Sequence, residues 1–225
     1  MRPAAVLWDM DGTIVDTEPY WMRAETELVA EHGGTWSVAE GMQLVGSGLV
    51  QSARILQQAG VALDVDEIIG TLTDRVMVQI EQGVPWRPGA RELISELRAE
   101  GIPIALVTMS MRRMALQVAA TIGDDVFQVV IAGDDVEHPK PHPQPYLLAA
   151  ERLGVEIGDC VAIEDSEFGL VSAVASGAAT IGVPLHLTLH EGPTHELWPV
   201  LSGRTVADLT AALERHHHRA TGAST

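Results

Sequence analysis

The sequence predicts an α/β fold, a doubly wound parallel sheet with an all-helical segment inserted after its first strand. Over residues 86–218, apolar runs of strand length alternate with helical patterns, which is typical of parallel strands joined by right-handed crossovers. Residues 16–85 hold amphipathic helical patterns and no convincing strand, although an apolar strand pattern directly precedes them. The helical segment is therefore an insertion, and we expect it to cover the strand ends as a cap.

The first predicted strand is an apolar run that begins at Ala4 and is ended by Asp9. Pro19 suits the first turn of a helix, and Gly33 and Gly34 end that helix. The insertion then holds three predicted helices, over residues 20–32, 50–59 and 65–82. Residues 83–89 are rich in proline and glycine and are suited to a hinge.

After this hinge the predicted helices and strands alternate to the end of the chain. The helices are expected over residues 90–100, 112–122, 145–153, 169–176 and 206–215, and the strands over 103–108, 126–132, 160–163 and 179–183. The sequence thus predicts a Rossmannoid core of residues 1–15 and 86–218, a helical cap of residues 16–85 and a disordered tail of residues 219–225.

The composition narrows the classes of partner. The formal net charge is −17, from 14 Lys and Arg against 31 Asp and Glu, so the overall field repels nucleic acids. Cys160 is the single cysteine and cannot pair within the chain, which indicates a reducing compartment. No signal peptide and no membrane-spanning run is visible. We expect a cytoplasmic protein, a monomer or weak homodimer, that contacts neither nucleic acid nor membrane.

Two carboxylates close the first predicted strand. Asp9 and Asp11 flank Met10, and Gly12 follows them. Carboxylates this close repel one another unless a cation or a shared proton relieves them. In an open parallel sheet, the carboxyl ends of the strands are where ligands bind. The pair therefore indicates a metal-assisted site, although a solvated Asp-x-Asp-Gly turn explains the pair equally well when it is taken alone.

More polar residues follow other predicted core strands. Thr108 closes one strand, Glu164 and Asp165 close another, and Lys140 lies in the loop after a third. Parallel strands bring their carboxyl ends to one edge of the sheet, so these residues can converge with Asp9 and Asp11. The set suits phosphoryl transfer, because carboxylates and substrate phosphate are the ligands that Mg²⁺ prefers, and a lysine and a hydroxyl can hold phosphate oxygens.

These motifs, in this order, resemble the four motifs of the haloacid dehalogenase (HAD) superfamily, in its magnesium-dependent phosphatase branch. The resemblance covers nearly the whole chain and rests on Asp9-Met10-Asp11-Gly12-Thr13, Thr108, Lys140 and Glu164-Asp165-Ser166. The position of the predicted cap resembles the subclass with a small helical cap, which includes β-phosphoglucomutases and the phosphatases of phosphoglycolate and hexose phosphates. The resemblance implies an enzyme that hydrolyses a small phosphorylated metabolite with Mg²⁺ through an aspartyl phosphate.

The resemblance also implies a role for each motif residue. Asp9 would be the nucleophile and a magnesium ligand, and Asp11 the general acid and base, which binds the metal through its main-chain carbonyl. Asp165 would complete the protein ligands of the metal, with Glu164 as a direct or water-mediated neighbour. The phosphoryl group would be held by Thr108 and Lys140, with the backbone of Met109 and Ser110.

Two alternatives stay open. A sugar phosphomutase of the β-phosphoglucomutase type usually carries an arginine in the cap loop, near residues 46–49 here, but Arg23 and Arg54 are off that register. A phospho-aspartate signalling domain also places acidic residues, a threonine and a lysine at parallel strand ends. Such domains are much shorter and carry the phosphorylated aspartate after a central strand.

The missing cap arginine and the length of the chain both argue against these alternatives. The sequence therefore favours a hydrolase that acts on a sugar, polyol or related phosphate.

Overall fold

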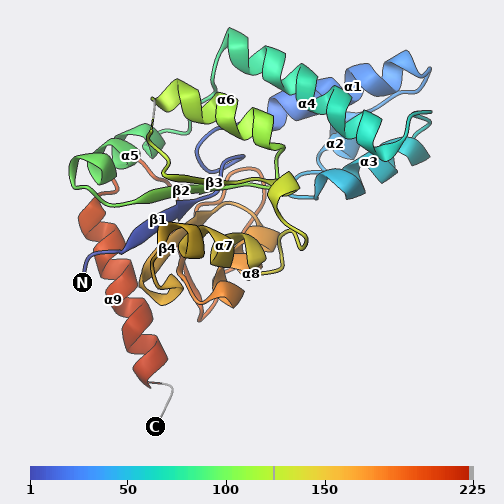
Figure 1. Cartoon of the computed structure of the whole chain (residues 1–225). Helices are drawn as coiled ribbons and strands as arrows, with labels where there is room; N and C mark the ends of the chain where they lie inside the picture. Colours follow the sequence, from blue (N-terminus) through green and yellow to red (C-terminus); the bar gives the residue numbers. More distant parts are fainter. Residues whose placement is uncertain (124, 223–225) are drawn as a thin grey trace.

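A six-stranded parallel sheet forms the centre of the computed structural model, which describes residues 1–123 and 125–222 (Figure 1). Its strands are β1 (Ala5–Trp8), β2 (Ile104–Val107), β3 (Val129–Ile131), β4 (Cys160–Glu164), β5 (Ala179–Gly182) and β6 (His195–Leu197). The spatial order is β3-β2-β1-β4-β5-β6, and every neighbouring pair is parallel. The predicted fold class is confirmed. The direction of winding reverses at β1, so the carboxyl ends of β2, β1 and β4 lie side by side at the switch point.

Helices cover both faces of the sheet because its strands are apolar on both faces. Val6 and Trp8 pack in one apolar cluster with residues of α5 (Ala90–Ala99), α6 (Arg112–Ile122) and α9 (Val206–Gly222). The alternate residues Ala5 and Leu7 point the other way and pack against α7 (Gln144–Leu153) and α8 (Glu167–Ser176). Two single-turn 3₁₀ helices, Gly133–Asp135 and Ile157–Asp159, lie in the connections. Continuous apolar runs thus make a sheet buried on both sides.

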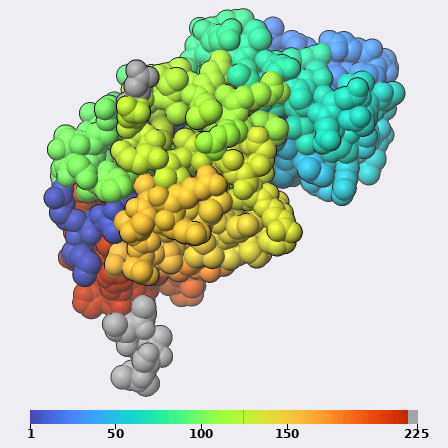
Figure 2. Space-filling view, viewed as in Figure 1, coloured from blue at the N-terminus to red at the C-terminus, as the bar shows by residue number. Residues whose placement is uncertain are grey.

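Four helices lie within residues 16–85, between β1 and α5. They are α1 (Glu18–Glu31), α2 (Val38–Gly41), α3 (Leu49–Gln58) and α4 (Val65–Gln82). They gather at one side of the molecule, and the space-filling view shows them in blue to teal as a lobe beside the sheet (Figures 1 and 2). Three of them match the predicted helices closely. The fourth, α2, was not predicted because it has only four residues. A capping box formed by Ser37 and Glu40 stabilises it.

The chain leaves and re-enters the sheet region along two adjacent connections. The Asp16 N–H donates to the Pro85 carbonyl at 2.7 Å, and the Arg87 N–H donates to the Ile14 carbonyl at 2.9 Å. Backbone hydrogen bonds therefore join the outgoing and the returning connection to each other. We propose that this paired crossing joins the cap, residues 16–85, to the core formed by residues 1–15 and 86–218.

The carboxyl-terminal region differs from prediction in two places. β6 has only three half-buried residues and no apolar run, so no strand pattern marks it and no strand is predicted there. Helix α9 continues to Gly222, so residues 219–222 of the predicted disordered tail are helical, while residues 223–225 lie outside the described residues. Arg215, where the helix was expected to end, is held by a bidentate bond to Glu196 of β6, at 2.7 and 2.8 Å.

One further expectation concerns membranes. Among the residues that the structure describes, no helix combines the length and the apolarity that a membrane crossing requires.

Candidate active site

The sheet topology brings the predicted site residues together at the carboxyl ends of β1, β2 and β4. Asp9 follows β1, Glu164 ends β4, and Lys140 reaches in from the loop after β3. A cavity of about 150 Å³ opens there between the strand ends and the helices of residues 16–85. Seven of the eight predicted site residues line it: Asp9, Asp11, Thr108, Met109, Ser110, Lys140 and Asp165. Glu164 is the exception, because it is fully buried.

Lys140 lies between two buried carboxylates. Its Nζ donates to Asp9 Oδ1 at 2.7 Å, to Glu164 Oε1 at 2.6 Å and to the Val107 carbonyl at 2.9 Å. Burial raises the pKa of Asp9 above its usual range, and the nearby charge of Glu164 adds to this, while the Lys140 ammonium opposes it. The lysine therefore compensates part of a crowded negative charge at the floor of the cavity.

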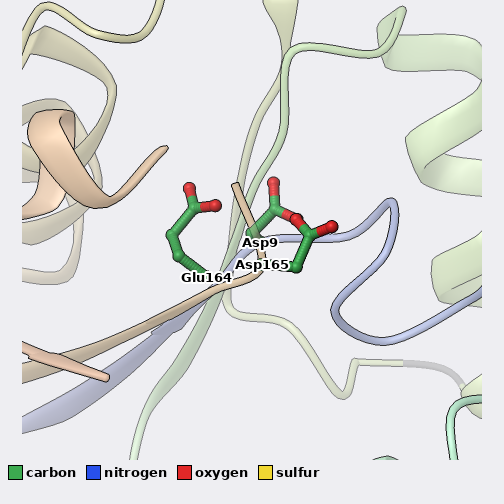
Figure 3. Close-up of side chains that lie close together, drawn as sticks. All are labelled: Asp9, Glu164 and Asp165. Carbon is green, nitrogen blue, oxygen red and sulfur yellow. The ribbon is translucent and has the colours of Figure 1, made fainter. Parts of the chain in front are cut away.

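The remaining negative charge fits a cation. Oxygens of Asp9, Glu164 and Asp165 all lie within 4.8 Å of one another, and Figure 3 shows these carboxylates close together at the strand ends. Asp9 Oδ2 is buried without a hydrogen-bond partner. Burial, followed by the charges of Asp9 and Glu164, raises the pKa of Asp165 well above its usual range. An oxygen-rich cluster with an unsatisfied carboxylate oxygen suits a hard divalent cation.

Two glycines allow the carboxylates to approach so closely. A Cβ atom on Gly12 would overlap the carboxylate of Asp165, and the φ of +79° at Gly12 is itself unfavourable for other residues. A Cβ atom on Gly169 in α8 would overlap the carboxylate of Glu164. The glycine of the Asp-x-Asp-Gly motif is thus required by the packing of Asp165 as well as by its turn.

Three hydroxyl groups hold the side chain of Asp11. Thr17 Oγ1 donates to Oδ1 at 2.5 Å, and Ser110 Oγ and Thr108 Oγ1 donate to Oδ2 at 2.6 and 3.2 Å. Thr108 Oγ1 also accepts from the Ser110 N–H at 3.0 Å. The structure therefore connects the second aspartate directly to the predicted phosphate-binding residues. The sequence does not predict a site role for Thr17, because a threonine just before a helix is typical of a helix cap.

Comparison with known proteins identifies the family. The model of the haloacid dehalogenase-like hydrolases matches residues 3–177, which include every motif described above. The chain belongs to this family.

Relatives within the family carry phosphatase names. Fructose-1-phosphate phosphatase YqaB of Escherichia coli is 32% identical, over 82% of this chain and 98% of that protein. A bifunctional riboflavin kinase/FMN phosphatase of Arabidopsis thaliana is 30% identical over 80% of this chain, which spans about half (48%) of that longer protein. CbbY of Rhodobacter sphaeroides, crystallised with xylulose-(1,5)bisphosphate, superposes with a TM-score of 0.84 at 28% identity, over 92% of this chain and 99% of CbbY. This member of the family is a phosphatase enzyme.

Two residues of this HAD hydrolase form hydrogen bonds that hold the site in place, although no sequence motif predicts this role for them. Tyr146, fully buried on α7, donates its hydroxyl to Glu164 Oε1 at 2.5 Å, and Lys140 Nζ lies 5.2 Å from its ring centroid. Burial, with the charge of Glu164, raises the pKa of this phenol, so it stays a donor. A tyrosine on a core helix is predicted to be a packing residue, so its bond to Glu164 is visible only in the structure.

Arg87 is the second such residue. It lies at the end of the hinge, is 6% exposed, and donates to the carbonyls of Gly12, Val183 (3.1 Å) and Pro184 (3.4 Å). Burial lowers its pKa, while the charges of Asp165 and Asp16 oppose that shift. One guanidinium thus ties the turn after Asp11 to the loop after β5.

We expect Arg87→Met to destabilise the protein by about 2–4 kcal/mol, because several buried carbonyls lose their charged donor at once. Urea unfolding followed by circular dichroism measures this loss. Arg152 is exposed on α7, and Arg152→Met is the matched control, with an expected change within about 0.5 kcal/mol. Equal effects of both substitutions would contradict the structural role of Arg87.

Proposed function

We propose that this enzyme hydrolyses a small sugar, polyol or related phosphomonoester with Mg²⁺, through an aspartyl phosphate on Asp9. The observation that carries the proposal is the state of the Asp9 carboxylate. It is buried at the floor of the cavity, with one oxygen bound to Lys140 at 2.7 Å and the other without a partner. A carboxylate held this way is oriented and desolvated, as a nucleophile requires.

Asp9 and Asp11 divide the chemistry. In the first step an Asp9 oxygen attacks phosphorus, the bond from phosphorus to the ester oxygen breaks, and Asp11 gives that oxygen a proton. In the second step Asp11 takes a proton from water, the water oxygen attacks phosphorus, and the bond to Asp9 breaks. The position of Asp11 beside Thr108 and Ser110 supports this role, because it lies next to the residues proposed to hold the phosphoryl group.

Thr108, Met109, Ser110 and Lys140 are the proposed phosphoryl-binding residues. All four line the cavity. Hydroxyl and backbone N–H groups would donate to the phosphoryl oxygens, and Lys140 would offset their negative charge. The bond from Lys140 to Glu164, which Tyr146 also contacts, holds the ammonium in place.

The proposed metal ligands are Asp9, Asp165, the main-chain carbonyl of Asp11 and, directly or through water, Glu164. Bound Mg²⁺ would neutralise charge on the phosphoryl oxygens and let the anionic Asp9 approach phosphorus. Among these residues Glu164 is the one whose carboxylate already accepts bonds from Lys140 and Tyr146, which favours the water-mediated position for it.

The absence of an arginine around the cavity favours hydrolysis over phosphoryl transfer to a second sugar phosphate. Among the described residues that line it, Lys140 is the one lysine or arginine. Arg23 and Arg54 are exposed, and Arg23 pairs with Glu27 on the outer surface of α1. A mutase needs a cationic group for the second phosphate of its bisphosphate intermediate.

A phosphate-release screen tests the proposed function. We expect the purified protein with Mg²⁺ to release inorganic phosphate from at least one compound among sugar, polyol, nucleotide and short carboxylic-acid phosphates. Chelation by EDTA is expected to lower the rate at least about a hundredfold, with recovery on adding Mg²⁺, since a cation must offset the carboxylate charge. Full activity in EDTA would contradict the metal requirement, and release from no compound would contradict the hydrolase proposal.

A further inference from the structure

The wall of the cavity formed by the inserted helices is acidic. Glu18 and Glu25 line the cavity from α1, where they stand two turns apart on the same side of the helix. The opposite, strand-end side already contributes Asp9, Asp11 and Asp165. The leaving group of a substrate whose phosphoryl group reaches Asp9 must lie against this acidic wall.

Neither glutamate has a cationic partner in the described part of the chain. Glu25 is 3% exposed, and its Oε2 accepts one bond, from Trp36 Nε1 at 3.3 Å. Lys140 is bound to Asp9 and Glu164. Burial raises the pKa of Glu18 to about 8, with additional repulsion from Glu25, Asp11 and Asp16, and burial raises the pKa of Glu25 to about 7. Because both pKa values are raised, the two carboxyls are ionised together only above about pH 8; the potential on this side of the cavity is then negative, and no cationic partner among the described residues compensates it.

We propose that Glu18 and Glu25 determine specificity, admitting leaving groups that present hydrogen-bond donors and excluding those that carry a second phosphate or a carboxylate. The inference rests on the proposed phosphatase function and adds to it the class of substrate. Hydroxyl groups can donate to either glutamate, and such charge-assisted bonds are stronger than neutral ones. A second anion would be desolvated beside like charges, which weakens its binding.

The neighbouring side chains fit the same class of leaving group. Trp21 and Leu72 also line the cavity and supply apolar surface, and Ser52, which is 7% exposed, supplies a hydroxyl. A polar, uncharged carbon chain with several hydroxyls can contact both kinds of surface. The bisphosphate bound by CbbY of Rhodobacter sphaeroides carries the second anion that this cavity would reject.

A matched pair of substrates tests the proposal. Glycerol 3-phosphate and 3-phosphoglycerate differ in one terminal group, a hydroxymethyl in the first and a carboxylate in the second. We expect the enzyme with Mg²⁺ at pH 9, where both glutamates are ionised, to prefer glycerol 3-phosphate by at least about a hundredfold in kcat/KM. Glu18→Gln and Glu25→Gln should each narrow this ratio about tenfold, chiefly by improving the use of 3-phosphoglycerate.

The variants separate specificity from structure. Glutamine at position 25 keeps an oxygen that can accept the Trp36 bond, and Glu18 is only half-buried, so both variants should fold. Glu81→Gln, on the exposed surface of α4, removes the same charge outside the cavity and should leave the ratio unchanged. An unchanged ratio in both cavity variants, or a ratio near one in the unmodified enzyme, would overturn the proposal.

A generic substrate separates this inference from the proposed function. If p-nitrophenyl phosphate is hydrolysed but neither matched compound is, their inhibition constants against it replace kcat/KM, with tighter inhibition expected from glycerol 3-phosphate. Equal inhibition by the two compounds would overturn the proposed selectivity of the acidic wall but not the proposed function. No magnesium-dependent hydrolysis of p-nitrophenyl phosphate or of any compound in the screen would overturn the proposed function, and the inference with it.

Discussion

Asp9→Asn is expected to lower kcat for phosphate release by at least about 10⁴-fold, because the amide cannot form the covalent bond to phosphorus. Asparagine has nearly the same shape and keeps an oxygen that can accept the Lys140 bond of 2.7 Å, so the native circular dichroism spectrum should be retained. Steady-state phosphate release with a substrate found in the screen measures the effect.

Asp66→Asn is the matched control for this substitution. Asp66 is exposed in the first turn of α4, away from the cavity lining, so the same chemical change there should leave kcat within twofold. A folded Asp9→Asn enzyme with more than about a tenth of the original kcat would show that another group attacks phosphorus.

Lys140→Met is expected to have the largest effect on stability. It leaves the carboxylates of Asp9 and Glu164 buried without the ammonium that both contact, at 2.7 and 2.6 Å. Removing one partner from such a buried group typically costs about 3–5 kcal/mol. The free energy of unfolding, measured by urea titration in EDTA at pH 8, should fall by that amount.

The pH dependence of this loss follows from the pKa of Asp9. The folded state already raises that pKa to about 7, and removing Lys140 raises it further, because the ammonium favours the ionised form. A carboxyl whose pKa is raised on folding stabilises the fold when protonated and loses that contribution as pH rises. The destabilisation by Lys140→Met should therefore be smallest near pH 4 and grow as pH rises through about 7.

An exposed ion pair provides the comparison for Lys140. Arg2 pairs with Glu100 on the surface, and Arg2→Met should change the free energy of unfolding by less than about 1 kcal/mol. If Lys140→Met cost no more than Arg2→Met at pH 8, or if its cost did not vary with pH, the account of the buried charge cluster would be wrong.

The sequence predicts the fold well where apolar patterns are long. Helices α4 and α6 begin and end where predicted, and four strands of the sheet lie within predicted apolar runs. The failures are elements whose stability comes from tertiary contacts. Strand β6 is held by pairing with β5, and the last part of α9 follows the bonds between Arg215 and Glu196. Such partners are distant in sequence, so a local pattern contains no trace of them.

The site was predictable because its residues follow strands whose ends the topology places together. Asp9, Thr108 and Asp165 needed only the order of a doubly wound sheet to converge. The residues around them carried no comparable signal. Arg87 resembles an ordinary hinge residue, Tyr146 an ordinary core aromatic, and Glu25 a charge on a helix surface, until the structure shows their burial and partners.

The central claim is that Asp9 carries the phosphoryl group during turnover, and trapping that group tests it most directly. The enzyme, with Mg²⁺ and p-nitrophenyl phosphate, is quenched in acid during turnover and reduced with borohydride, which converts an aspartyl phosphate to homoserine. Peptide mass spectrometry then locates the change. We predict homoserine at position 9, with Asp11 and Asp165 unmodified. Turnover with Asp9 intact, or with homoserine at position 11 or 165, would contradict the account.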